Sequence, residues 1–119
     1  LISGVYDLPA YIADSSAITV RKAIVASMMS ETGGTADALV ARSILRRAGD
    51  IKASTLILNG AKDDRTDPNQ ARALADHITR GGGNARAIIY PDFDHKIPVE
   101  VRNKDIDPFI DEVLGASSR

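Results

Sequence analysis

The chain has no cysteine and no tryptophan, and only 4% of its 119 residues are aromatic. Without cysteine, disulfide scaffolds, cysteine nucleophiles and thiolate metal sites are excluded. The few aromatic residues argue against platforms that stack nucleic-acid bases. No apolar run approaches the roughly 20 residues of a membrane-spanning helix, and no signal-peptide pattern opens the chain. We therefore expect a cytoplasmic protein that binds neither membrane nor nucleic acid.

The sequence also lacks an excess of either positive or negative charge. Fifteen basic and sixteen acidic residues give a net charge of −1, with a sequence pI near 6.1. A nucleic-acid surface would need a basic face or stripe. The length predicts one domain, residues 1–119, that buries about two-thirds of its unfolded surface. The first residue is Leu1 and not methionine, so we expect the natural start to lie upstream.

Three short apolar segments are predicted to be strands. Residues 55–60 and 85–91 are rich in Ile, Leu or Ala and are closed by turn residues, as is typical of strands in parallel sheets. Residues 1–6 are a third candidate, a strand that would already have started before Leu1.

The helix expected between the last two strands has clear end signals. Asp67 is a candidate N-cap, Pro68 suits the first helical position, and Gln70 has capping-box spacing. An apolar stripe at helical spacing follows: Ala71, Leu74, Ala75 and Ile78. Glycines 81–83 then end the helix.

Helical stripes also occupy the two remaining regions. Residues 13–50 carry two of them, separated by Gly33 and Gly34, and predict a helical insertion between the first two strands. A C-terminal stripe consists of Ile106, Phe109, Ile110, Val113 and Leu114. Pro108 within it marks either an early helical position or a kink. The whole order predicts an α/β fold, with a short, mostly parallel sheet of about three strands flanked by helices.

Titratable residues follow two of the predicted strands. Asp63 lies after residues 55–60, and His95 lies after residues 85–91. Because the carboxyl ends of neighbouring parallel strands share one edge of the sheet, an Asp and a His can meet there. A carboxylate on one imidazole nitrogen fixes the tautomer and stabilises the imidazolium when the other nitrogen takes a proton. Acid before histidine is the order of Ser…Asp…His hydrolases.

Residues 51–63 resemble the late strand and acid loop of the α/β-hydrolases, most closely the branch of dienelactone hydrolases and prolyl-oligopeptidase-like enzymes. Residues 90–95 resemble the histidine loop of that branch, and residues 1–8 the strand after its nucleophile helix. The resemblance implies a partial α/β-hydrolase fold in which Asp63 is the triad acid and His95 the triad base. Ser54, commonly proline in relatives, and Asn59, often histidine, depart from the pattern.

The Gly-x-Ser-x-Gly nucleophile motif of that family does not occur in these residues. The resemblance places the nucleophile and the oxyanion hole upstream of Leu1. It therefore implies the acid-and-base half of a serine hydrolase that acts on a small ester, lactone or peptide substrate. We expect the isolated chain to be inactive, with no cofactor and no bound metal.

Other interpretations of the same residues stay open. Asp64 is the nearest rival for the acid, Asp67 is expected to be only a helix cap, and His77 is expected to lie on the solvated surface. A hard cation could be held by carboxylates and histidine at the sheet edge: Asp63, Asp64, Asp92, Asp94 and His95. The chain could also be a stand-alone, non-catalytic module. Its bare strand at residues 1–6 would then pair with a second copy in a homodimer.

Overall fold

The computed structural model describes residues 1–15 and 18–117. The elements, in chain order, are α1 (Leu8–Asp14), the 3₁₀ turn η1 (Thr19–Arg21), α2 (Lys22–Thr32), α3 (Ala36–Ala41), the 3₁₀ segment η2 (Ile44–Asp50), β1 (Thr55–Gly60), α4 (Pro68–Arg80), β2 (Ala85–Tyr90) and α5 (Val99–Ser117). The predicted α/β character is confirmed.

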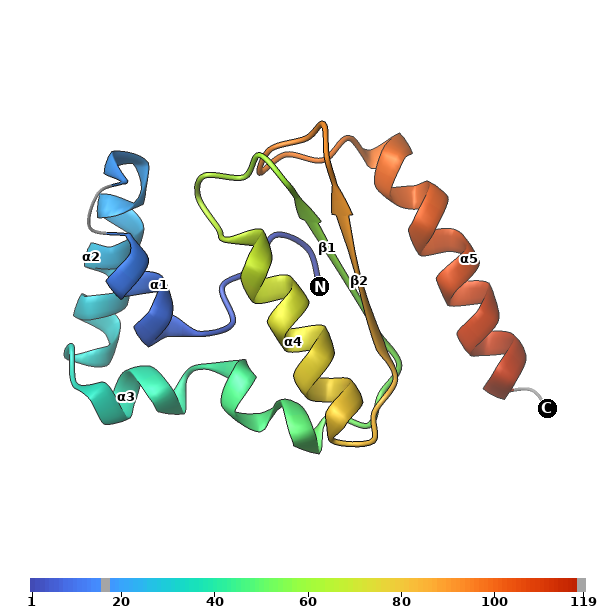
Figure 1. Ribbon diagram of the computed structural model, residues 1–119, viewed down its shortest axis with the longest axis horizontal. Coiled ribbons are helices and arrows are strands. Elements are labelled where there is room, and N and C mark those ends of the chain that lie inside the picture. Colours follow the sequence, from blue (N-terminus) through green and yellow to red (C-terminus); the bar gives the residue numbers. More distant parts are fainter. Residues whose placement is uncertain (16–17, 118–119) are drawn as a thin grey trace.

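The strands β1 and β2 form a parallel pair in which Thr55 lies opposite Ala85 and Gly60 opposite Tyr90. Helix α4 connects them and covers one face of the sheet, while α5 lies on the other side (Figure 1). Alternate residues of β1 enter two cores, since successive side chains point to opposite faces. Ile57 packs on the α4 side, and Leu56 and Leu58 pack on the α5 side.

The expected strand at residues 1–6 is reduced to one bridge. Ile2 pairs with Leu58 in parallel orientation, and Ser3 N donates to Leu58 O at 2.9 Å. Ser3 has φ +50°, in the left-handed region, so its backbone turns away from the extended path. At Gly4 the ring of Tyr6 folds back so closely that a Cβ would lie 2.6 Å from it. This turn ends the pairing and leads the chain into α1.

Helix α4 begins as predicted, but one of its end signals has another use. The Asp67 side chain accepts from Asn69 N at 2.9 Å, and the apolar stripe is buried. The capping box expected for Gln70 is wrong. Its Oε1 accepts from Tyr6 N at 2.8 Å and Asp7 N at 3.0 Å, so the amide holds the chain entering α1. If Gln70 capped α4 instead, the N–H groups of residues 6 and 7 would lose this acceptor, and an unpaired buried N–H group is costly.

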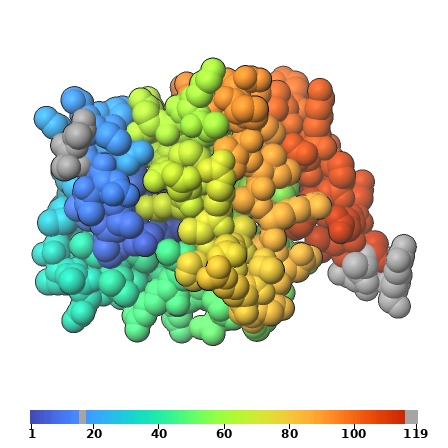
Figure 2. Space-filling view, viewed as in Figure 1, coloured from blue at the N-terminus to red at the C-terminus, as the bar shows by residue number. Residues whose placement is uncertain are grey.

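The helical insertion is longer and more divided than predicted. It starts at Leu8, not at residue 13, because Asp7 Oδ1 caps α1 by accepting from Ala10 N. The second predicted helix is split, since Ser43 has extended backbone angles and its hydroxyl donates to Leu39 O and accepts from Leu8 N. Figure 2 shows this segment (blue to cyan) packed against the surface around α4, on the opposite side from α5.

Helix α5 starts well before the predicted apolar stripe and contains Pro108 in its interior. Ile106 and Phe109 pack against the sheet, whereas Ile110 is 45% exposed and Leu114 63% exposed. Only part of the stripe is therefore covered. None of the helices in the described ranges has both the length and the apolar character needed to cross a bilayer.

Candidate active site

The two loops that follow β1 and β2 lie against each other at one end of the sheet. Gly60 makes the approach possible, because a Cβ there would lie 2.1 Å from Asp94 O and 2.3 Å from Phe93 O. Backbone bonds join the loops: Ala61 N donates to Tyr90 O at 2.8 Å, and Lys62 N donates to Phe93 O at 3.0 Å. The end of β1 thus fixes the position of the histidine loop.

Asp63 lies in a site made of hydrogen-bond donors. Its side chain is 0% exposed. Oδ1 accepts from Arg65 N and Thr66 N, both at 2.9 Å, and Oδ2 accepts from the Thr66 hydroxyl at 2.6 Å. Burial alone would raise the pKa of Asp63. The hydrogen bonds from Thr66, from His95 and from Arg65 N outweigh burial and hold this pKa below its usual value. The carboxylate is therefore ionised at neutral pH.

His95 completes the pair. Its Nδ1 lies 2.9 Å from Asp63 Oδ2. An ionised carboxylate only accepts, so Nδ1 carries the proton and neutral His95 keeps a lone pair on Nε2. The His95 side chain is 33% exposed, and the backbone carbonyl of His95 accepts from the Ser3 hydroxyl at 3.2 Å. The structure therefore brings together the two residues that the sequence selected.

An open pocket of about 340 Å³ adjoins His95. It is lined by Val20, Asp64, Arg65, Asp94, His95 and Lys96. Both loops contribute to it, and Val20 adds a wall from the helical insertion. The arrangement offers a buried, ionised acid and a partly exposed base next to space for a substrate.

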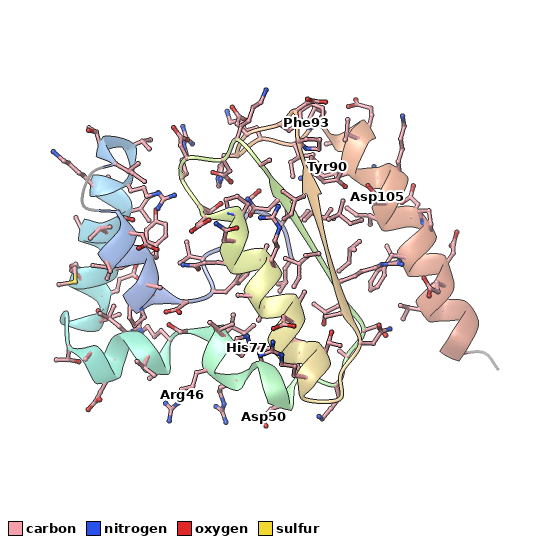
Figure 3. All side chains as sticks on the ribbon, in the orientation of Figure 1. Arg46, Asp50, His77, Tyr90, Phe93 and Asp105 are labelled. Atoms are coloured by element: carbon pink, nitrogen blue, oxygen red, sulfur yellow. The ribbon has the colours of Figure 1, made fainter. Side chains whose placement is uncertain are left out.

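The rival candidates lie outside this pair. Asp64 is exposed at the pocket, and the hydrogen bond described for it goes to its backbone carbonyl, which accepts from Arg21 Nε. Asp94 Oδ1 accepts from Lys96 N at 3.0 Å within its own loop. Asp67 caps α4, and His77 lies exposed on α4 (Figure 3). Among the residues that the structure describes, no three acidic or histidine side chains are grouped as a metal site requires.

Sequence reasoning missed Thr66, which supports the pair, and a separate side-chain contact at the end of β2. Thr66, which gives Asp63 two donors, stands in an Asp-x-x-Thr spacing that could have identified it. Tyr90, at the end of β2, donates its hydroxyl to Asp105 Oδ2 on α5 at 2.6 Å (Figure 3). Burial and then the Asp105 carboxylate raise the pKa of Tyr90, so the donor stays protonated. Nothing in the local sequence links Tyr90 to Asp105.

Comparison with known protein families finds a match, and it covers nearly the whole chain. The profile of the prolyl oligopeptidase family matches residues 2–116. The match includes the strands, the helical insertion and both loops of the site. Among curated proteins, no match was found.

Proposed function

Because the chain belongs to the prolyl oligopeptidase family, a family of serine hydrolases, we propose that it provides the acid and the base of a hydrolytic site. Its substrate would be a small ester, lactone or peptide, as in the dienelactone-hydrolase-like and prolyl-oligopeptidase-like branch. The observation that carries the proposal is the 2.9 Å contact between His95 Nδ1 and the buried Asp63 carboxylate. That contact leaves Nε2 as the nitrogen that can take a proton.

The chemistry follows from this placement. A serine from outside these 119 residues attacks the carbonyl carbon, and His95 Nε2 takes its proton. Asp63 stabilises the resulting imidazolium and keeps the ring in one orientation. The imidazolium then returns the proton to the leaving group, and a water molecule repeats the cycle to release the acyl group. The serine must be supplied from elsewhere because no Gly-x-Ser-x-Gly motif is present.

The test compares the 119-residue chain with a protein extended through the coding sequence upstream of Leu1. We expect the chain alone to leave p-nitrophenyl esters intact and not to react with a fluorophosphonate probe. The extended protein should do both. In it, Asp63→Ala and His95→Ala should each lower kcat by roughly 10⁴-fold or more.

Three outcomes would contradict the proposal. A start codon directly before Leu1, or an upstream segment without a nucleophile motif, would remove the source of the serine. Turnover by the chain alone would refute the claim that these 119 residues lack a nucleophile. Ser3→Ala would then test whether Ser3 is that nucleophile, because its hydroxyl already contacts the backbone carbonyl of His95.

A second candidate function, a non-catalytic module that pairs with itself, is favoured by the edge of the sheet. Ile2 is 42% exposed, and no hydrogen bond to its backbone occurs within the described ranges. A groove of about 290 Å³ runs beside it, lined mainly by apolar side chains of the N-terminus, β1 and α5. We propose a second copy as the occupant, since unpaired strand edges pair with other strands and a two-fold contact closes on itself.

The dimer is tested by native mass spectrometry and light scattering over a concentration series. We expect a dimer of the 12.7 kDa chain that Ile2→Lys converts to a monomer. Val99→Lys is the matched control, because Val99 is 51% exposed and is not part of the groove. A wild-type chain that stays monomeric at high concentration would exclude this second function.

A further inference from the structure

The peptide group between residues 64 and 65 is held at both of its polar ends. Its N–H, on Arg65, donates to Asp63 Oδ1 at 2.9 Å. Its carbonyl, on Asp64, accepts from Arg21 Nε at 2.7 Å. In a planar trans peptide the N–H and C=O point in opposite directions. Fixing the carbonyl therefore fixes the direction in which the amide points at the acid.

The next peptide group, between residues 65 and 66, is held in the same way. Its N–H, on Thr66, donates to Asp63 Oδ1 at 2.9 Å. Its carbonyl, on Arg65, accepts from the Tyr11 hydroxyl at 2.5 Å. Hydrogen bonds in such a chain polarise one another, so the bond at the carbonyl also strengthens the amide as a donor.

We propose that Tyr11 and Arg21 are positioning residues for the acid Asp63, acting through these two peptide groups. The inference rests on the proposed function for its meaning in catalysis. The two side chains come from α1 and η1 of the helical insertion, so this segment has a role beyond packing. It holds the acid loop in the conformation that presents two amides to one carboxylate oxygen.

The burial of the two side chains supports this role. Tyr11 is 0% exposed and Arg21 is 5% exposed. The guanidinium lies 4.9 Å from the centre of the Tyr11 ring, and its Nη1 lies 3.4 Å from the Ser15 hydroxyl. Burying a guanidinium is costly unless hydrogen bonds and a nearby ring compensate. Packing alone would need only an apolar side chain at this position. A buried arginine that donates to the loop carbonyl next to the acid therefore indicates a role in holding that loop.

The readout that separates positioning from mere packing is the titration of Asp63, followed by the carboxyl ¹³C resonance of the folded 119-residue chain. Of the titratable groups, His95 contacts this carboxylate and the Tyr11 hydroxyl lies within reach of its charge. Asp64 and Arg65 follow it in the chain, and Arg21 binds the Asp64 carbonyl. The Thr66 hydroxyl, the Thr66 amide, His95 and the Arg65 amide together hold the Asp63 pKa below its usual value. Loosening the two amides should therefore raise this pKa, whereas loss of packing elsewhere should not.

Tyr11→Phe removes only the hydroxyl that binds the Arg65 carbonyl. We expect it to raise the Asp63 pKa, because the Thr66 amide then donates less well to Oδ1, and to speed hydrogen exchange at that amide. Tyr6→Phe is the matched control. Tyr6 is also a buried tyrosine, but its hydroxyl takes no part in the hydrogen bonds described for the acid loop. The Asp63 titration should be unchanged in this control.

Arg21→Lys gives a second, independent test because it keeps the positive charge and loses the Nε donor. It should also raise the Asp63 pKa, with faster exchange at the Arg65 amide. It carries the test if Tyr11→Phe does not fold. A folded Tyr11→Phe or Arg21→Lys chain in which Asp63 titrates as in the wild type would overturn the proposal. The titration uses no substrate, so this failure is distinct from absence of hydrolysis in the extended protein.

Discussion

Replacing Thr66 by valine removes one of the four hydrogen bonds described for the Asp63 carboxylate, with almost no change in side-chain shape. The lost bond joins the Thr66 hydroxyl to Asp63 Oδ2 at 2.6 Å, and the carboxylate is fully buried. Losing a buried donor to a charged acceptor costs about 1.5–3 kcal/mol. We expect Thr66→Val to lower the free energy of unfolding at pH 7 by about 2 kcal/mol.

The loss should depend on pH. The pKa of Asp63 is lower in the folded chain than its ordinary value. An acid of this kind stabilises the fold fully above its unfolded pKa, about 3.9, and this stabilisation disappears as the pH falls through the folded pKa. Valine moves the folded pKa upward toward the unfolded value. The difference between wild type and variant should therefore be largest above about pH 5 and should shrink below about pH 4.

The assay is urea unfolding of both proteins at pH 7 and at pH 3.5. With a urea m-value of about 1.5 kcal/mol/M, the expected loss lowers the pH 7 midpoint by about 1.3 M. Thr66→Ser is the control, because it keeps the hydroxyl and should retain most of the stability. A Thr66→Val midpoint within about 0.3 M of wild type at pH 7, or an equal loss at both pH values, would refute the reasoning.

Two further substitutions test the fold around the site. Gly60→Ala places a methyl group 2.1 Å from Asp94 O and should destabilise the chain by about 3 kcal/mol or more; an unchanged urea midpoint would show that the loops do not meet as described. Pro108→Ala restores a backbone donor at an exposed position inside α5 and should raise the melting temperature by several degrees, whereas a lower one would mean that the proline ring packs favourably.

The local sequence was sufficient for the βαβ unit that carries the site. The strands at residues 55–60 and 85–90 are short apolar runs, and α4 has a capped start and a buried stripe. Signals of this kind depend on neighbours within a few residues. Parallel pairing then puts Asp63 and His95 at the same edge of the sheet, which is why this Asp–His pair could be predicted before any contact was known.

What the sequence did not reveal depends on residues far apart in the chain. Gln70 binds the backbone at residues 6 and 7 instead of capping α4. The first segment forms one bridge because Ser3 turns away from β1. In both cases, contacts available only in the folded chain override a plausible local pattern.

The support of the acid shows the same division. The sequence by itself predicted that a carboxylate and an imidazole would meet at this edge, because strand ends and residue types are local properties, and the family resemblance then favoured Asp63 over Asp64. Only the tertiary structure placed Tyr11 and Arg21, which lie 54 and 43 residues away in the chain from their carbonyl partners. Because every residue has a backbone carbonyl, a hydrogen bond to one does not depend on the type of the accepting residue. No sequence pattern therefore predicts it. Packing of the helical insertion against the acid loop decides where those donors point.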